Sequence, residues 1–168
     1  MKVGLPVGEF TCPITFERVR PPRPVVKAEG GVTYVVQGGY ELAFRTVLRF
    51  ANGAELPIRG KLFGEDSQKV VLRDVKGKPA ALSGYTQGRS EILDADGNVI
   101  FEGRYYDTRT YQALTGDDAL TPTGIGICDH WINGFGRADY AGHAFSLGVH
   151  LTREHDPAFR GEARGRID

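Results

Sequence analysis

Cysteine is nearly absent from this chain, and its two cysteines, Cys12 and Cys128, lie far apart in the sequence. They form no CxxC pair and no series of spaced cysteines, so the chain has neither a disulfide framework nor a cysteine-based metal or redox motif. We expect both residues to be buried free thiols, and the alternative is a single bridge between them.

An excess of charge of either sign is also absent, because 21 lysines and arginines balance 21 aspartates and glutamates. The chain as a whole has no field that would attract nucleic acid or an anionic membrane, and we expect neither as a partner. Apolar runs as long as a signal-peptide core or a membrane helix are missing too. A cytoplasmic location is the resulting expectation.

A helical apolar stripe is missing as well, since no long window keeps an i, i+3, i+4, i+7 pattern free of glycine. The chain instead contains 23 glycines, which separate short segments rich in valine, isoleucine, phenylalanine, tyrosine and threonine. That pattern is typical of strands joined by turns. The length of 168 residues and the 40% apolar content predict one domain, residues 1–168.

Two hairpins are predicted by alternating strands on either side of a turn sequence. In Tyr40–Phe50 apolar side chains alternate with charged ones, and Asn52-Gly53 follows directly. Asp96-Gly97 occupies the same position in the second hairpin. Such pairs favour tight type I′ turns, because both central residues need a positive φ angle. The hairpins join residues 40–50 to 55–63 and residues 89–93 to 99–111.

The remaining strands are predicted at residues 9–19, 32–37, 69–75, 123–133 and 143–153. The prolines at residues 21–24 predict a loop, and residues 115–120 could form one turn of helix. The polar and basic end of the chain, residues 156–168, is predicted to be a flexible tail. Closing so many strands removes exposed edges, so the prediction is an all-β, antiparallel, hairpin-rich β-barrel of eight or nine strands with little helix.

The segment GFGRADYAG at residues 134–142, with the alternating strand after it, resembles the glycine- and aromatic-rich turn of allene-oxide-cyclase and dirigent-like barrels, which are calycin-like. The resemblance implies an eight-stranded barrel, often oligomeric, that guides a small apolar substrate through cyclisation or coupling. None of the catalytic residues of those families can be placed on this sequence. Similar turns also occur in unrelated barrels, where glycine supplies a tight corner.

A candidate site is carried by the strand at residues 99–111. Its odd positions are the more apolar set, so they are expected to face inward and to place Tyr105, Asp107 and Arg109 along one interior line. An aspartate beside an arginine keeps its charge and can orient a tyrosine hydroxyl or a substrate carbonyl. Tyr40 is expected to join Arg109 in binding the substrate. The alternative is that the strand leaves the core after Tyr105 and the ion pair is solvated.

The strand at residues 123–133 offers two possible inward faces. One face carries Asp129 and the only tryptophan, Trp131, and the other carries Cys128 and His130. We assign Asp129 as a catalytic residue with a raised pKa and Trp131 as a substrate contact. If the other face points inward, Cys128 and His130 line the interior instead, and Asp129 could also lie in a turn network.

His143 is a further catalytic candidate, because it shares the apolar face of the last predicted strand, whereas His150 points the other way. Histidine accepts and returns a proton near neutral pH, which suits an isomerase or cyclase. The alternative is a hydrogen-bonded histidine at the rim of the barrel.

Motifs for cofactors are not found. Potential metal ligands gather in the last third of the chain, but HxH and HExxH pairs are missing. Only pairing between distant strands could assemble a metal site. The chain also lacks a P-loop, a dinucleotide fingerprint and a GxSxG elbow. No metal and no cofactor are therefore predicted.

Two functional hypotheses follow. The first is a cofactor-independent isomerase, cyclase or lyase that acts on a small, largely apolar or aromatic molecule by acid–base chemistry inside the barrel. The second is a noncatalytic barrel that binds a ligand or another protein. The neutral net charge and the glycine-rich strand faces suit a symmetric partner, so a homodimer is expected.

Overall fold

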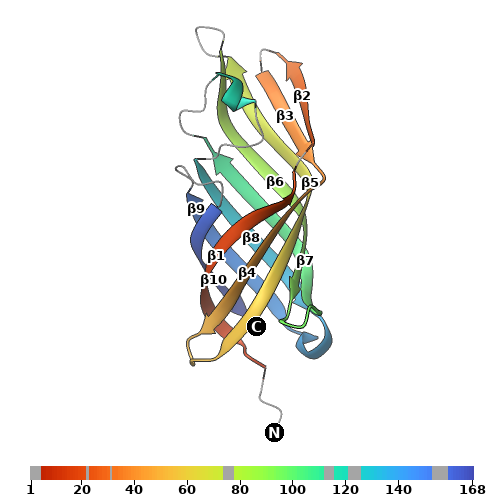
Figure 1. Cartoon of the computed structure of the whole chain (residues 1–168), viewed down its shortest axis with the longest axis vertical. Coiled ribbons are helices and arrows are strands. Elements are labelled where there is room, and N and C mark those ends of the chain that lie inside the picture. The colour runs from red at the N-terminus through yellow and green to blue at the C-terminus, as the bar shows by residue number, and fades with distance from the viewer. Residues whose placement is uncertain are drawn as a thin grey trace.

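The structure is a computed structural model that describes residues 5–21, 23–30, 32–73, 78–111, 116–120, 126–152 and 159–168. Strands make up nearly all of it (Figure 1). The ten strands are β1 (Gly8–Arg20), β2 (Arg23–Glu29), β3 (Val32–Gly38), β4 (Tyr40–Phe50), β5 (Glu55–Arg73), β6 (Pro79–Leu93), β7 (Val99–Thr110), β8 (Ile127–Gly136), β9 (Ala144–Thr152) and β10 (Phe159–Ile167). Two short 3₁₀ helices accompany them, η1 (Gly116–Ala119) and η2 (Ala138–Tyr140).

Eight of these strands form a closed antiparallel barrel. Its order is β5-β4-β1-β10-β9-β8-β7-β6, and pairing between β6 and β5 closes the ring. Each of these eight strands pairs with a barrel strand on both sides, although β1 and β4 have no paired residues between Thr11↔Arg49 and Glu17↔Ala43. The predicted fold, an all-β, hairpin-rich barrel with little helix, is confirmed.

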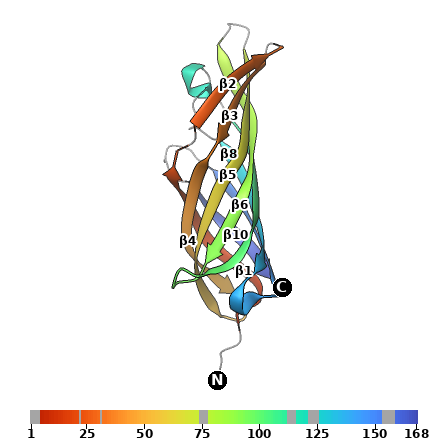
Figure 2. The ribbon, with the colours of Figure 1, turned by 90° about the vertical axis from the view of Figure 1, so that its right-hand side faces the viewer.

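The hairpin of β2 and β3 lies outside the barrel wall. β3 pairs with the last part of β5, from Gln68 to Leu72, so the hairpin extends the sheet at the end of the barrel away from both termini (Figures 1 and 2). We call this end the upper end and the opposite one the lower end. The proline-rich segment at residues 21–24 was predicted to be a loop, but Arg23 and Pro24 begin β2. Proline is tolerated there because β2 is an edge strand.

Both predicted hairpin connections are present, with one residue more than a type I′ turn. After β4, Phe50 N–H donates to the carbonyl of Ala54 over 2.9 Å. Only Gly53 of that turn has a positive φ angle, 83°. After β6, Asp94 and Asn98 form the matching bond, and Gly97 has a φ angle of 90°. In a three-residue connection that ends in glycine, only the glycine adopts a positive φ angle, so Asn52 and Asp96 do not need one.

One long strand replaces two predicted ones. β5 runs through residues 55–73, because register shifts against β6 at Gly64/Asp66 and Val70/Val71 let it bend without ending. The predicted strand ends at residues 74–75, 123–125 and 153 lie outside the described residues. The predicted helical turn at residues 115–120 corresponds to η1, for which Gly116–Ala119 are described.

The last part of the predicted flexible tail is a barrel strand, which corrects that prediction. β10 pairs with β1 on one side and with β9 on the other, so it closes the wall between the chain's first and last thirds. Three of its described inward residues, Gly161, Ala163 and Gly165, are small, and a Cβ at Gly165 would lie 2.4 Å from the ring of Phe10. Glycine makes room for that ring, and the alternation of large apolar residues that marks a strand is lost.

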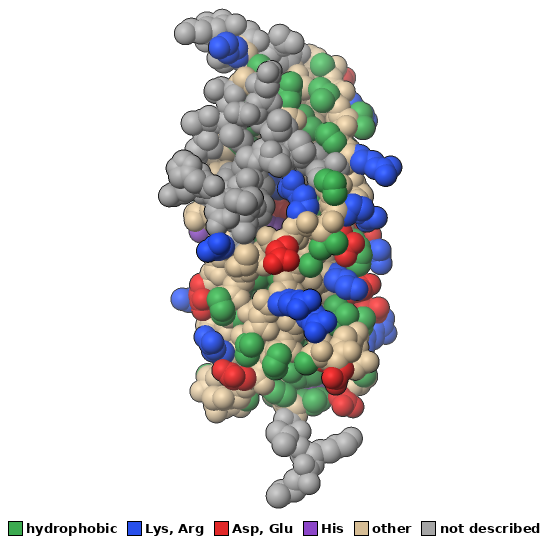
Figure 3. All heavy atoms as spheres, in the orientation of Figure 1, with side chains coloured by type: hydrophobic (Ala, Val, Ile, Leu, Met, Phe, Trp, Pro, Cys, Tyr) green, Lys and Arg blue, Asp and Glu red, His purple; other side chains and the backbone are tan. Residues whose placement is uncertain are grey.

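The outer surface carries interspersed positive and negative side chains with scattered apolar ones (Figure 3). Exposed ion pairs across strands include Arg89 and Arg104 with Glu65, and Arg137 with Glu102. In the described part of the chain no helix is long and apolar enough to cross a membrane.

The lower half of the barrel interior is filled by aromatic rings. Phe10 packs against Phe50 and Phe145 with ring centroids 5.6 and 5.7 Å apart, and Phe101 packs against Tyr140 and Phe145 at 4.9 and 5.1 Å. Each aromatic contact of this kind stabilises the fold by about 0.5–1.5 kcal/mol beyond the contribution from burying the rings. The lower half is therefore an ordinary packed core.

Candidate functional site

The upper half of the interior differs, because one side of it is polar. Strands β4 to β8, which are neighbours in the barrel, bury polar side chains there that we call the polar wall: Tyr40, Ser67, Lys69, Thr86, Tyr105, Asp107, Arg109, Cys128 and His130. Strands β1, β9 and β10 contribute the facing apolar wall: Cys12, Ile14, Phe16, Val149, Leu151 and Ala163. Buried polar groups cost free energy unless they are hydrogen-bonded, so this clustering calls for an explanation.

An ion pair forms the centre of the polar wall. Arg109 Nε donates to Asp107 Oδ1 over 2.8 Å, and the two side chains are only 6% and 2% exposed. Arg109 Nη2 also donates to the Tyr40 hydroxyl at 3.2 Å and to Ser67 Oγ at 3.4 Å. Ser67 Oγ in turn lies 2.9 Å from Thr86 Oγ1. The guanidinium therefore links side chains from β4, β5 and β7. The alternative interpretation, in which Asp107 and Arg109 form a solvent-exposed ion pair, is wrong.

Glycines opposite the two buried tyrosines make room for their rings. A Cβ at Gly64 of β5 would lie 2.5 Å from the Tyr40 ring, and one at Gly88 of β6 would lie 2.8 Å from the Tyr105 ring. Neither ring could keep its place beside a larger residue. The sequence thus positions both hydroxyls of the site by omitting side chains on the neighbouring strands.

His130 lies directly across the sheet from Asp107, because β8 pairs with β7 in the register Asp107↔His130. Its imidazole stacks on Phe16 of the apolar wall with centroids 4.7 Å apart, and the ring of Tyr105 is nearly parallel to it at 6.4 Å. Among the described residues His130 Nδ1 has no hydrogen-bond partner, and the Tyr105 hydroxyl, although it lies beside the Tyr40 hydroxyl, makes no hydrogen bond of good geometry. Within the described part of the chain, two buried polar atoms that face one interior thus lack a hydrogen-bond partner.

Burial decides the protonation of these groups. It raises the pKa of Tyr105 far above the ordinary value, and the neighbouring Tyr40 adds to the shift. It also raises the pKa of the Cys128 thiol, an effect that the charge of Asp107 increases. Burial lowers the pKa of His130, although Asp107 opposes the shift. Near neutral pH the tyrosine and the thiol therefore keep their protons, and the imidazole is uncharged.

Two cationic side chains occupy the polar wall. Burial is the largest single influence and acts against the charge of Arg109, but Asp107, Tyr40, Tyr111 and Cys128 together outweigh it and hold the pKa well above its ordinary value. For Lys69, burial and the charge of Arg109 act together and lower the pKa to about 8. Lys69 Nζ lies 5.3 Å from the centroid of the Tyr111 ring. Arg109 is thus the cation whose charge persists at every physiological pH.

A metal site is the other arrangement that this geometry suggests. Asp107, Cys128 and His130 can each offer a ligand atom, and these atoms lie within 4.8 Å of one another. Pairing of β7 with β8 assembles them, the only route to a metal site that the sequence left open. However, Asp107 is bound by the guanidinium of Arg109, which would repel a cation held by the same carboxylate. We therefore assign no metal to these residues.

Two of the predicted site residues lie outside the barrel. Asp129 is half-buried on the outer face of β8, where its Oδ1 lies 2.6 Å from His150 Nδ1. Trp131 is 43% exposed and stacks on Tyr106 with centroids 5.9 Å apart. The prediction that Asp129 and Trp131 line the interior is thus wrong. The inward face of β8 is the alternative one, which carries Cys128 and His130.

His143 does not join the site either. It precedes β9 at the lower end of the barrel, where its Nδ1 lies 2.7 Å from the carbonyl oxygen of Asp168. The residue of β7 at the same height along the barrel is Phe101, which pairs with Gly136. Asp107 is six residues further along β7, about 20 Å away at the usual rise of a strand. His143 is therefore a rim histidine, as the alternative interpretation had it.

Of the residues predicted for the site, Tyr40, Tyr105, Asp107 and Arg109 are brought together. The sequence analysis missed Ser67, Lys69 and Thr86, which come from the bent part of β5 and from β6. The register shift at Gly64/Asp66 changes which residues of β5 face inward, so simple alternation could not have found Ser67 and Lys69.

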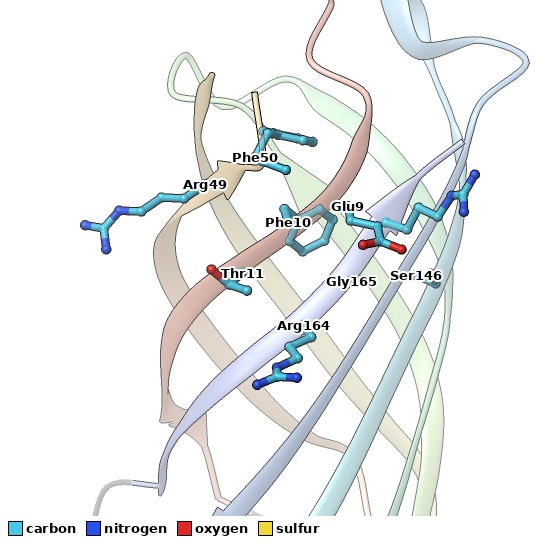
Figure 4. A pocket seen from close by; sticks show the side chains of 10 residues that line it. Glu9, Phe10, Thr11, Arg49, Phe50, Ser146, Arg164 and Gly165 are labelled. Atoms are coloured by element: carbon cyan, nitrogen blue, oxygen red, sulfur yellow. The ribbon is translucent and has the colours of Figure 1, made fainter. Parts of the chain in front are cut away.

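A groove of about 730 Å³ lies outside the site, near the lower end, where β1, β4 and β10 meet (Figure 4). Phe10 and Phe50 contribute to it, and Arg49 and Arg164 extend from its rim in different directions (Figure 4). Arg49 is engaged by Glu55 at 3.5 Å. Because these cations do not converge on one point, the groove is a weaker candidate than the polar wall.

The fold and the site define the class of protein: a closed, eight-stranded antiparallel β-barrel whose interior holds a buried ionisable cluster at one end. Comparisons with protein-family models, with curated protein sequences and with solved structures gave no match. The resemblance to allene-oxide-cyclase and dirigent-like barrels consequently rests on the segment at residues 134–142 alone. There β8 ends, η2 follows, and Gly142 has a φ angle of 92°.

Proposed function

We propose that this barrel binds a small, largely apolar molecule that carries a carbonyl or carboxylate group, and acts on it as a cofactor-independent isomerase, cyclase or lyase. The observation that supports the proposal is a pair of buried polar atoms in the polar wall, the Tyr105 hydroxyl and His130 Nδ1, which have no partner among the residues that the structure describes. Each such atom costs about 1–3 kcal/mol of stability. A ligand with polar atoms in these positions would recover that cost.

The composition of the two walls supports the same class of ligand. Arg109 and the hydroxyls of Tyr40 and Tyr105 suit an oxygen atom with developing negative charge, because all three can donate hydrogen bonds. The apolar wall opposite suits a hydrocarbon or aromatic body, which would take the place that the Phe16 ring occupies on His130. Such a division of the lining orients a ligand by its polar end.

The protonation states support acid–base chemistry. A neutral His130 can accept a proton from a carbon next to the carbonyl, through Nδ1 when its other nitrogen carries the proton. The electron pair left on carbon moves to the carbonyl oxygen, where the Tyr105 hydroxyl and the Arg109 guanidinium stabilise it. If the substrate carries a carbon–carbon double bond at its β and γ carbons, His130 then returns the proton to the γ carbon while the electron pair moves back from oxygen, so the double bond shifts to the α and β carbons and the isomerisation is complete. Asp107 keeps the guanidinium in place throughout.

A noncatalytic ligand-binding barrel is the second candidate, and the closed hydrogen-bond network favours it. Arg109, Asp107, Tyr40, Ser67 and Thr86 are already bonded to one another. A network of this kind can serve folding and ligand orientation alone.

Deuterium exchange separates the two candidates. A small-molecule extract of the producing cells is incubated in D₂O with the wild-type protein, and the bound fraction is analysed by mass spectrometry. The proposal predicts deuterium on carbon in the bound compound, with loss of exchange in His130→Gln. Trp131→Phe, on the outer face, is the control that should exchange normally. A bound compound without exchange would instead establish the noncatalytic candidate.

A further inference from the structure

Strand β2 forms a free edge of the sheet. In the part of the chain that the structure describes, it pairs with β3 on one side and with no strand on the other. All seven of its residues are exposed, and Val25 and Val26 are each 55% exposed. An exposed edge presents unpaired N–H and C=O groups, so a second strand can add to β2 through residues other than Pro24, which has no N–H. This edge lies at the upper end, away from the barrel wall (Figure 2).

We propose that β2 pairs antiparallel with β2 of a second copy of this chain, about a two-fold axis through Val26. The proposal does not depend on the proposed function, because β2 contributes no residue to the polar wall. An antiparallel edge contact between identical strands is a two-fold contact of the kind that closes a dimer. The sheets of the two copies would then be continuous across the contact.

The charges of β2 are self-complementary in this register. Its sequence is RPVVKAE, with a cation at the first position and an anion at the last. Pairing about Val26 places Arg23 of each copy opposite Glu29 of the other, and Val25 opposite Lys27. Arg23, Val25, Lys27 and Glu29 share one face, since they alternate with the face that carries Val26. Two ion pairs therefore form at the ends of the contact, on the same face of the sheet.

Neighbouring registers are excluded by the same charges. A shift by two residues in one direction places Lys27 opposite Lys27, and a shift in the other direction places Arg23 opposite Lys27. Like charges directly opposite each other destabilise a strand pair. A shift by one residue would turn one strand over and bring the wrong faces together. Charge and alternation thus select one register, the one centred on Val26.

The first test exchanges the charges. Wild-type protein is predicted to be dimeric by sedimentation at about 100 µM, since small interfaces bind weakly. Arg23→Glu or Glu29→Arg alone places like charges at both ends and should weaken the dimer about tenfold or more. The double variant R23E/E29R restores opposite charges and should restore the dimer. A monomeric wild type, or single variants that dimerise normally, would overturn the proposal.

A cross-linking test fixes the register independently. In Val26→Cys the two introduced cysteines are directly opposite, with Cα atoms about 4.5–5.5 Å apart, which a disulfide can span. In Val25→Cys they are diagonal, about 7–8 Å apart, beyond its reach. Val25 and Val26 are equally exposed, so the second variant controls for reactivity. We expect a covalent dimer from V26C alone. Equal cross-linking of both variants, or of neither, would contradict the assigned register.

Discussion

Arg109 and Asp107 project from alternate positions of β7 into the barrel and bind each other there, with Arg109 Nε 2.8 Å from Asp107 Oδ1. The pair ties together the hydroxyls of Tyr40 and Ser67 from two other strands. A buried guanidinium of this kind is stable only while its carboxylate remains. The hydrogen bonds that join these side chains in the upper interior thus depend on one ion pair.

Removing one partner of this pair should be far worse than removing both. Asp107→Asn leaves a buried charge without its counter-ion, so the free energy of unfolding should fall by about 3–5 kcal/mol. The double variant D107N/R109M buries no charge and should lie much closer to the wild type. Urea unfolding of the three proteins measures both effects. A loss below about 1 kcal/mol in D107N would mean that the pair is solvated.

Tyr105→Phe should separate stability from function. The Tyr105 hydroxyl is buried without a partner among the described residues, so its removal should leave stability unchanged or raise it by about 1–3 kcal/mol. Ligand binding should nevertheless weaken, because the hydroxyl is proposed to donate to the ligand.

Tyr140→Phe is the matched control for this experiment. Its hydroxyl is also buried without a described partner, but it lies at the lower end beside Phe101. The same gain in stability is expected, with ligand binding unchanged. If Y105F and Y140F affect binding equally, the Tyr105 hydroxyl has no part in the site.

The fold was accessible from the sequence because most strands keep a regular alternation. In Tyr40–Phe50 the apolar residues point to one face and the charged residues to the other, and the observed strand has the bounds that were predicted. β10 was missed because its inward residues include Gly165, whose missing side chain leaves space for Phe10. A small residue on one strand that makes room for a large residue on another strand cannot be recognised from the sequence of either strand alone.

The site was accessible only in part, for a similar reason. β7 keeps its apolar residues on the face of Asp107 and Arg109, so its orientation could be predicted. β8 carries apolar and ionisable residues on both faces, and only its register against β7 shows that Cys128 and His130 point inward. The position of His143 along the barrel axis depended in the same way on where the neighbouring strands end.

Acid should destabilise the wild type more than a His130 variant. Because burial lowers the pKa of His130 in the folded state, below about pH 6.5 the unfolded chain binds a proton that the folded one does not. Stability therefore falls with falling pH, by up to about 1.4 kcal/mol per pH unit from this group. Asp107 and Asp129 oppose the shift, and Arg109 adds to it.

The measurement is the free energy of unfolding between pH 4 and 7, taken as the difference between wild type and His130→Gln. That difference should change with pH below about 6.5. His150→Gln, on the exposed outer face, provides the comparison. A difference for H130Q that stays constant with pH would show that the imidazole binds its proton equally well in the folded and the unfolded state, contrary to this account.

Both cysteines should be unreactive in the folded protein. Each is buried, and burial raises the pKa of Cys12 to about 11 and that of Cys128 further. Thiol reagents attack the thiolate, so no thiol should react at pH 8 in the native state and two should react in denaturant. The folded state also holds the Cys12 proton between pH 9.0 and about 11, so stability falls as pH rises through that window. Rapid labelling of native protein would contradict this burial.

The most direct test of the central claim, a ligand held by the polar wall, is mass spectrometry under native and then denaturing conditions. The protein is measured as purified and after incubation with a small-molecule extract of the producing cells. We predict one organic molecule bound to each 18.4 kDa chain, released on denaturation and absent from the D107N/R109M variant. A bare chain under both conditions, or the same bound mass in the variant, would contradict the claim.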